Sequence, residues 1–262
     1  MIPKIIHYCW FGKNPLPELA SKCIESWKKF CPDYQIIEWN ETNFDVNYCE
    51  YSKEAYQEKK WAFVSDVSRL YALVNCGGIY MDTDVEVLKP LDEFLNLQAF
   101  SGFEAADRLP TGIMAAEKGQ ELFVELLKEY DNIHFKLDDG SLDTTTNVTR
   151  ITNTCLKYGA VLNNTKQTVK GFTLFPFDYF CPKDSTTKIV NLTKNSYTIH
   201  HFDGSWLTEE DRLYEKIYIK RAKFMPKKLA SYSAKFYAIR KIRGLKAAIK
   251  EVFAWKEKRS KK

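Results

Sequence analysis

The sequence predicts an α/β fold with parallel strand pairing, and three observations support this prediction. The chain has 262 residues, of which 45% are hydrophobic and 15% aromatic, so it can bury a large core. Near the N-terminus, strand-like, helical and strand-like segments follow one another at residues 4–10, 17–30 and 32–40. Farther on, a strongly apolar helical segment at residues 61–76 leads into a short apolar run at 79–82. This alternation of strands and helices is typical of parallel sheets.

The remaining elements follow from apolar patterns and turn residues. Gly77 and Gly78 suit the end of the helix that begins near residue 61. Apolar residues at helical spacing predict helices within residues 119–130 and 144–159, the second capped by one of its threonines. Short apolar runs predict further strands at residues 85–88, 98–104, 112–117 and, running into a loop, 197–206.

The net charge of +5 is unevenly distributed. Residues 216–262 contain 17 Lys and Arg against two Glu, a balance of about +15, so the rest of the chain is acidic by about 10 charges. Apolar residues in this basic segment recur at steps of mostly three and four, which predicts an amphipathic helix with Gly244 as a weak point. We therefore expect an α/β domain over residues 1–215 and a basic amphipathic helical extension over residues 216–262.

The cysteines indicate a reducing environment. There are seven, an odd number, they form no C-x-x-C pair, and most lie within apolar patterns. This favours reduced, buried thiols in a cytoplasmic protein over a disulfide framework or a zinc site. The stretch "MIPKIIHYCW" is too short for a signal peptide, and no later run reaches transmembrane length.

Asp82 and Asp84 follow the apolar run "GIYM" and are separated by one residue. In an extended chain they point to the same side, where their charges repel each other. A divalent cation that also binds a diphosphate would balance this charge, because Mg²⁺ and Mn²⁺ prefer oxygen ligands. Two other interpretations remain, a solvated strand end and a phosphatase that uses D-x-D, although Glu86 occupies a position where such phosphatases have Thr or Val. A calcium loop is excluded, because Val87 stands where that loop needs glycine.

Asp66 and Arg69 precede this pair on the apolar helical segment. They are three residues apart and therefore share one face of a helix. A surface ion pair is the simplest interpretation. However, Phe63, Val67 and Leu70 make the helix look well buried, so solvated charges are less expected there.

Four stretches together resemble a known family. They are "IPKIIHYCWFG", "SWKKFCPDYQIIEWNE", "KKWAFVSDVSRLYALVNCGGIYMDTDVEVLKPLD" and "HHFDGSW". They are similar to the D-x-D sugar-binding glycosyltransferases of family 32, which include bacterial capsule and cell-surface polysaccharide enzymes, fungal α-1,6-mannosyltransferases and, more distantly, the glucosyltransferase domain of clostridial toxins. The resemblance is strong over residues 1–120 and extends to residue 207 in fragments. It implies a GT-A-like single domain with a mixed, mostly parallel central sheet that transfers a hexose with retention at the anomeric carbon.

The resemblance also implies roles for the catalytic set Asp66, Arg69, Asp82 and Asp84. Asp84 would bind the metal directly, and Asp82 would reach both the ribose and the metal. Asp66 and Arg69 would hold hydroxyls of the donor sugar, with Arg69 near the phosphates. Tyr80 would pack beside the nucleotide. No nucleophile is identified, and a front-face mechanism would need none.

Four further residues predicted to contact the donor or the metal lie outside this set. Trp10, at the end of the first strand, would stack on the base. His201 and Ser205 would complete the metal and diphosphate shell, with Asp203 as a competing ligand. Trp206 would close over the donor as a mobile lid.

Other positions receive structural interpretations. His7 is expected to be a hydrogen-bonded core residue. The segment around Thr111 and Gly112 matches a family stretch that often contains Asn, so the residue nearest the anomeric carbon stays open. Residues 145–147 could face the acceptor, but capping of the following helix is the favoured role.

The predicted ligands are Mn²⁺ or Mg²⁺ and a nucleotide-sugar, for which a UDP-hexose is favoured and GDP-mannose is the alternative. The predicted acceptor is a glycan, expected to be a lipid-linked intermediate of capsular or cell-surface polysaccharide. If the protein is not an enzyme, the alternative is an inactive or lectin-like module that only binds sugar-nucleotides. The basic extension would bind either an anionic membrane at the inner face of the cell or the protein's own body. No nucleic-acid-binding motif is present, and nucleic acid is not an expected partner.

Overall fold

The computed structural model describes residues 1–110, 112–204 and 208–251. The chain divides into two compact units, Met1–Phe202 and Asp203–Lys262, and each is considered by itself. The domain boundary predicted after residue 215 stays a prediction, although helix α7, Glu209–Ala222, runs across that position.

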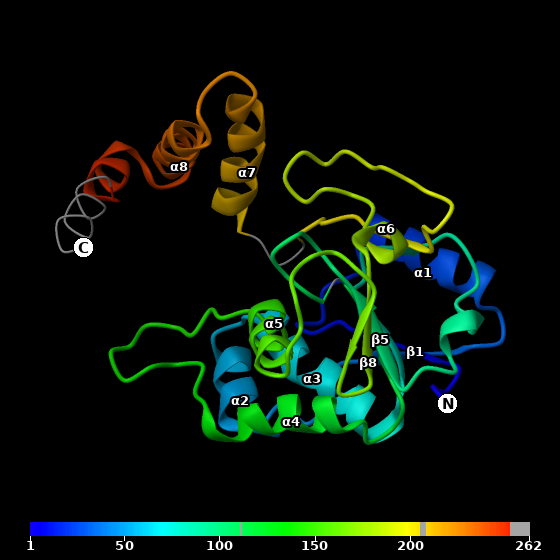
Figure 1. Ribbon diagram of the computed structural model, residues 1–262. Helices are drawn as coiled ribbons and strands as arrows, with labels where there is room; N and C mark the ends of the chain where they lie inside the picture. The colour runs from blue at the N-terminus through cyan, green and yellow to red at the C-terminus, as the bar shows by residue number, and fades with distance from the viewer. Residues whose placement is uncertain (111, 205–207, 252–262) are drawn as a thin grey trace. The chain divides into compact units, whose positions relative to one another are not determined.

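A seven-stranded sheet forms the centre of the first unit (Figure 1). Its strands, in spatial order, are β2 Gln35–Trp39, β1 Ile5–Cys9, β3 Gly78–Met81, β6 Ile113–Ala116, β5 Ala99–Gly102, β8 Phe172–Phe175 and β7 Gln167–Val169. The pairings β1–β2, β1–β3 and β5–β8 are parallel, whereas β6 and β7 run against their neighbours. The predicted mixed, mostly parallel sheet is therefore confirmed. Strands β7 and β8 were not predicted from the sequence, because they are short and lack clear alternation.

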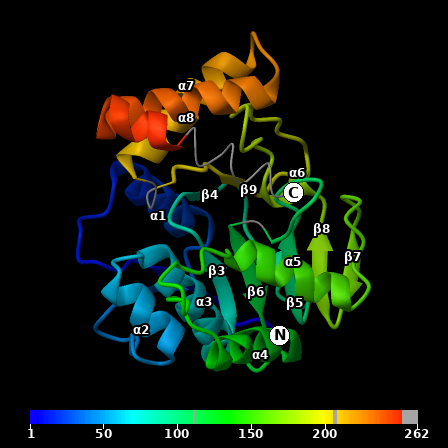
Figure 2. The same ribbon diagram turned by 90° about the vertical axis from the view of Figure 1, so that its left-hand side faces the viewer.

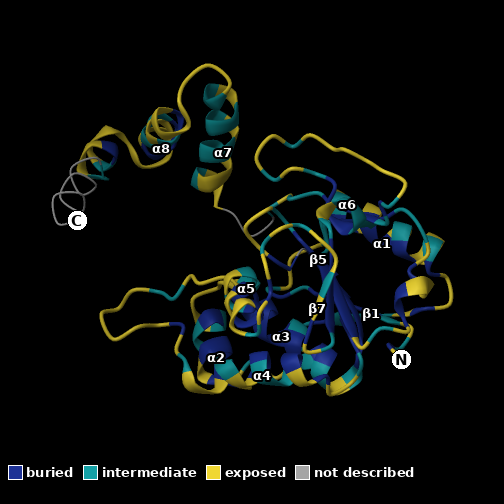
Figure 3. Ribbon diagram, in the orientation of Figure 1, coloured by how far each residue is buried: buried dark blue, intermediate teal, exposed yellow. Residues whose placement is uncertain are grey.

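Helices cover both faces of this sheet. On one face lie α2 Glu50–Gln57, α3 Trp61–Cys76, α4 Glu121–Glu129 and α5 Asn147–Lys157, and on the other lie α1 Glu18–Phe30 and the short α6 Phe177–Phe180 (Figure 1). The inner strands β1, β3, β6, β5 and β8 are almost wholly buried, whereas the edge strands β2 and β7 are partly exposed (Figure 3). Helix α3 ends at Cys76 with Gly77 as its C-cap at a φ of 69°, as the two glycines predicted. None of the seven cysteines forms a disulfide, and six of them are buried.

A second sheet of two strands adjoins the end of β3. It pairs β4 Val85–Val87 with β9 Thr198–His200 in antiparallel register, so that Val85 lies opposite His200 (Figure 2). Trp27 of α1 is fully buried, and its indole Nε1 donates to the carbonyl oxygen of Val85 over 2.7 Å. Helix α1 thus supports the strand that follows Asp84.

The second unit is a helical pair, and the predicted helical extension is confirmed in the described residues. Helices α7 and α8, Lys227–Arg243, pack against each other, and α8 ends at Gly244. The buried stripe of α8 consists of Ala230, Ala234, Ala238 and Ile239. Three of these four residues are alanines, whose small side chains let α7 and α8 approach each other closely. None of the helices in the described part of the chain is long and apolar enough to cross a membrane.

Candidate active site

The candidate site lies where strands β1 and β3 end. These strands run in parallel, so their carboxyl ends meet at one edge of the sheet. Asp82 follows β3 directly, and its backbone N–H donates to the carbonyl oxygen of Gly112 over 2.8 Å. A Cβ atom on Gly112 would lie 3.1 Å from Asp82 Oδ2 and 3.0 Å from His200 Nδ1. Glycine at this position therefore leaves the space that both side chains occupy.

Asp82, Asp84 and His200 form a cluster that suits a divalent cation. One ligand atom of each lies within 4.8 Å of the others. His200 Nε2 is 3.3 Å from Asp84 Oδ1 and 3.9 Å from Asp82 Oδ2. Two carboxylates and an imidazole are donors that Mn²⁺ accepts, and the carboxylates also suit Mg²⁺. The two carboxylates thus lie close together, as the D-x-D spacing predicted, and a cation can balance their charge.

His200, and not the predicted His201, faces the two aspartates. Adjacent residues of a strand point to opposite sides, so only one of the two histidines can do so. His201 Nε2 instead lies 2.8 Å from Glu86 Oε2. The choice is made by the register between β4 and β9, in which His200 is paired with Val85. The prediction that His201 belongs to the metal-binding cluster was therefore wrong, because its side chain contacts Glu86.

The two aspartates of the cluster raise the pKa of His200. Burial by itself lowers its pKa, but the carboxylates of Asp84 and Asp82 outweigh burial and hold the pKa well above 6.5. Without a metal, a proton on His200 balances part of the negative charge. A bound divalent cation would take over that balancing role.

The guanidinium of Arg69 lies near the carboxylates of both Asp82 and Asp66. Its Nη1 is 3.4 Å from Asp82 Oδ1, and its Nη2 is 3.4 Å from Asp66 Oδ1. The side chains of Arg69 and Asp66 are only 14% and 10% exposed, so this is not a surface ion pair. Burial raises the pKa of Asp66 to about 6, and the Arg69 charge opposes that effect. The predicted shared face is confirmed.

Tyr80 is a hydrogen-bond donor to the carboxylate of Asp82. It is buried, its hydroxyl donates to Asp82 Oδ1 over 2.9 Å, and the Arg69 guanidinium lies 4.6 Å from its ring centroid. The carboxylate of Asp82 therefore has two fixed partners. The structure shows Tyr80 orienting Asp82, while its predicted packing beside a nucleotide stays a prediction.

The other predicted residues are placed as follows. Trp10 is half-buried at the end of β1, and its indole Nε1 donates to the carbonyl oxygen of Asn14 over 2.6 Å. His7 is buried with both ring nitrogens in use, one against Trp39 Nε1 and one against the Gly77 carbonyl oxygen, which confirms it as a core residue. Thr111, Ser205 and Trp206 lie outside the described residues.

The fold brings two further polar residues to the site. From the sequence, Asn147 was considered only as an acceptor-facing or helix-capping residue, and Glu104 was not singled out. Asn147, the first residue of α5, contacts Asp66, while Thr146 caps the helix by accepting from the Thr149 N–H. Glu104 follows β5, which ends at the same edge as β3; burial raises its pKa, and the charge of His200 opposes this shift. The sole sequence signal for Glu104 was an acidic residue at the end of a predicted strand.

Comparison with known proteins agrees with this geometry. Residues 17–101, which include both aspartates, match the family model described as "Glycosyltransferase sugar-binding region containing DXD motif". Over these residues the chain is similar to the sugar-binding region of DXD glycosyltransferases. The predicted family resemblance is thereby confirmed, and the mixed sheet agrees with the GT-A-like fold that it implied.

Several glycosyltransferases are similar to this chain over part of its length. Inositol phosphoceramide mannosyltransferase 3 of Schizosaccharomyces pombe is 26% identical over 142 residues, which is 51% of this chain and 38% of the relative. An uncharacterized glycosyltransferase of Acanthamoeba polyphaga mimivirus is 29% identical over 63% of this chain and 67% of its own. Among solved structures, the PaToxG glycosyltransferase matches 60% of this chain and 68% of its own with a TM-score of 0.43 and 18% identity. The chain spans less than two fifths of the yeast relative's length.

Proposed function

We propose that this protein is a metal-dependent, retaining glycosyltransferase that moves a hexose from a nucleotide-sugar to a glycan acceptor. The observation that carries the proposal is the arrangement of Asp82, Asp84 and His200 beside the buried Arg69–Asp66 pair. A cation site for a diphosphate thus adjoins two side chains that can bind sugar hydroxyls and phosphate. The family match over residues 17–101 supports the same assignment.

Each residue has a proposed part in binding and transfer. A divalent cation held by Asp84, Asp82 and His200 would stabilise the negative charge that develops on the leaving diphosphate. Arg69, whose guanidinium lies between Asp66 and Asp82, would contact the phosphates from the protein side. Asp66 would orient the sugar through its hydroxyls and would not attack it. The acceptor's proton would pass to the departing phosphate, so this proposal needs no protein nucleophile.

The nucleoside would lie over the carboxyl ends of β1 and β3. Trp10 directly follows β1 and is half-buried, so an indole face there could stack on the base. Ser205 and Trp206 keep the roles proposed from the family resemblance, as a diphosphate contact and a lid.

Two nucleotide-sugars are candidates for the donor, and they differ in both base and sugar. A UDP-hexose agrees with a stacked base and a D-x-D metal site. A mannose donor such as GDP-mannose is favoured by the yeast relative, whose name describes a mannosyltransferase. The two donors differ in base and sugar, so a direct comparison separates them.

A thermal-shift screen with UDP-glucose, UDP-galactose and GDP-mannose, each with and without Mn²⁺, tests the proposal. A ligand that binds only the folded protein stabilises it by mass action, so at a hundredfold excess over Kd we expect Tm to rise by about 5 °C or more. The rise should require both the metal and one particular donor. If Tm stays constant with every donor, or rises without metal, the proposal fails.

The same reactions distinguish enzymes from binding modules. Free nucleoside diphosphate should accumulate with the donor that raises Tm, by transfer or slow hydrolysis. A lectin-like module would bind the donor without releasing nucleotide, and a phosphatase would cleave phosphomonoesters instead. Either result would replace the transferase assignment.

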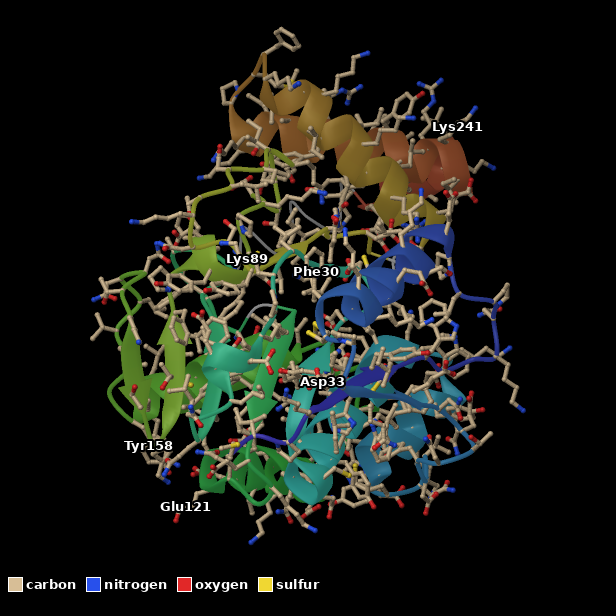
Figure 4. All side chains as sticks on the ribbon, turned by 90° about the vertical axis from the view of Figure 1, so that its right-hand side faces the viewer. Phe30, Asp33, Lys89, Glu121, Tyr158 and Lys241 are labelled. Carbon is tan, nitrogen blue, oxygen red and sulfur yellow. The ribbon has the colours of Figure 1, made fainter. Side chains whose placement is uncertain are left out.

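We further propose that the second unit attaches the enzyme to an anionic membrane where a lipid-linked acceptor is located. Eight of the 17 exposed large hydrophobic residues of the described chain lie between residues 224 and 249, among them Phe224 at 84% and Leu229 at 60% exposure. Basic side chains surround them, and Lys241 projects outward from α8 (Figure 4). Exposed apolar groups among lysines suit the interface of an anionic bilayer.

Sedimentation with liposomes tests this attachment on the full-length chain. We expect pelleting with anionic liposomes, little with neutral ones, and a decrease as salt is raised. The double variant Phe224→Ser/Leu229→Ser should pellet less. Its matched control is Val161→Ser/Leu192→Ser, which removes side chains of 57% and 56% exposure from the first unit. Equal loss in both variants, or no pelleting of the wild type, would contradict the attachment.

A further inference from the structure

The second unit contains a groove between the end of α7 and one face of α8. Its volume is about 470 Å³, and the side chains that line it include Arg221 of α7 and Leu229, Tyr232, Phe236, Tyr237 and Arg240 of α8. The α8 residues recur mostly at steps of three and four, so they form one face of the helix. This face lies beside the alanine stripe that packs on α7 and is itself largely exposed. An aromatic and apolar surface is therefore left uncovered within the unit.

The two arginines of the groove have no acidic partner. Neither Arg221 nor Arg240 forms an ion pair within the described part of the chain, whereas Arg243 pairs with both Glu210 and Glu251. Residues 216–250 contain 12 Lys and Arg and no Asp or Glu, so the sequence around the groove supplies no counter-charge. The Arg221 guanidinium lies 5.6 Å from the Tyr237 ring centroid, which keeps it at the groove. The groove thus combines two positive charges with an apolar face.

A lipid phosphate, a phosphate monoester joined to a hydrocarbon tail, has the complementary chemistry. Its head carries close to two negative charges at pH 7, which match the two guanidinium groups, and arginine binds phosphate oxygens through paired hydrogen bonds. Its tail gains by leaving water for an apolar face. A free phosphate ion would leave that face uncovered. A second copy of the same unit would bring the same positive charge and would be repelled.

We propose that this groove binds one lipid phosphate, with the phosphate between Arg221 and Arg240 and the hydrocarbon tail along the apolar face of α8. This inference rests on the proposed membrane attachment, because it names the lipid group that the second unit recognises. Diffuse attraction to an anionic surface depends on the number of positive charges. Binding in the groove depends in addition on where two guanidinium groups are placed.

The test is isothermal titration calorimetry of the full-length chain with dihexanoyl phosphatidic acid below its critical micelle concentration. We expect saturation at one lipid per chain. The double variant Arg221→Gln/Arg240→Gln should raise Kd about tenfold or more, because it removes charge-assisted hydrogen bonds to the phosphate. Dihexanoyl phosphatidylcholine, whose choline neutralises the head, and inorganic phosphate, which has no tail, should each bind at least about tenfold more weakly than phosphatidic acid.

Lys220→Gln/Lys241→Gln is the matched control. It removes the same charge from the adjacent position on each of the two helices, and neither lysine lines the groove. Kd for phosphatidic acid should stay within about twofold of wild type. If Arg221→Gln/Arg240→Gln does not fold, Arg221→Lys/Arg240→Lys is measured instead. It keeps the charge but loses the paired hydrogen bonds of arginine, so it should still raise Kd.

Four outcomes would overturn the inference. The first is no saturable binding of phosphatidic acid to the wild type. The second is an equal rise in Kd in the arginine and lysine variants, which would mean diffuse attraction. The third is inorganic phosphate binding as tightly as phosphatidic acid. The fourth is a dimer in sedimentation velocity that Leu229→Ser dissociates, which would place a second copy in the groove. Failure of the proposed attachment is distinct, because then the wild type does not pellet with anionic liposomes, whatever the groove binds.

Discussion

Replacing Asp84 with asparagine is expected to abolish metal-dependent donor binding and to reduce transfer by about 10²–10³-fold or more. Asp84 Oδ1 lies 3.3 Å from His200 Nε2, at the centre of the cluster, and an amide provides one neutral oxygen in place of a carboxylate. The cation site then loses one of its two negative charges. The thermal-shift assay with donor and Mn²⁺, followed by rate measurements at saturating donor, checks both effects.

Glu86→Gln is the matched control for Asp84→Asn. Glu86 is two residues farther along the chain and pairs with His201, away from the cluster. It should keep metal-dependent binding and activity within about twofold, because it removes only a partly exposed ion pair. If Asp84→Asn retained the Mn²⁺-dependent rise in Tm, or if both variants lost it equally, the proposed metal site would be wrong.

Replacing Trp27 with alanine is expected to lower the free energy of unfolding by about 3–5 kcal/mol, as for other large aromatic side chains removed from a core. Trp27 is 0% exposed, its ring centroid lies 5.7 Å from that of Tyr8 in an edge-to-face arrangement, and its indole N–H is bonded to the Val85 carbonyl. The substitution creates a cavity and leaves that carbonyl without a partner. Chemical denaturation of the full chain measures the loss.

Two further variants separate stability from function. Trp27→Phe keeps much of the volume but removes the hydrogen bond to Val85, so it should be clearly less destabilising than alanine. Trp10→Ala removes a half-buried ring and should cost less stability than Trp27→Ala while weakening donor binding, if Trp10 stacks on the base. A small loss of stability in Trp27→Ala would show that α1 does not support β4 as the contacts indicate.

Local sequence patterns were sufficient for much of the fold. The run of apolar residues from Trp61 and the two glycines after Cys76 predicted α3 and its end, because helix periodicity and left-handed backbone at glycine are local properties. The same pattern placed Asp66 and Arg69 on one face, since residues three apart on a helix are neighbours. The short strands β7 and β8 escaped prediction, because their pairing with each other and with β5 is what stabilises them.

For the site, the sequence by itself determined the Asp82–Asp84 pair after β3 and the Asp66–Arg69 pair on α3, since spacing within one element decides which side chains share a face. Only the tertiary structure decided that His200 and not His201 joins the aspartates, because that depends on the register between strands more than 100 residues apart. Packing likewise brought Asn147 to Asp66 across 81 residues and buried the Asp66–Arg69 pair. The apolar pattern of α3 indicated that the helix is buried, but the register between strands and the contact between α5 and Asp66 arise from distant segments, and no local pattern encodes them.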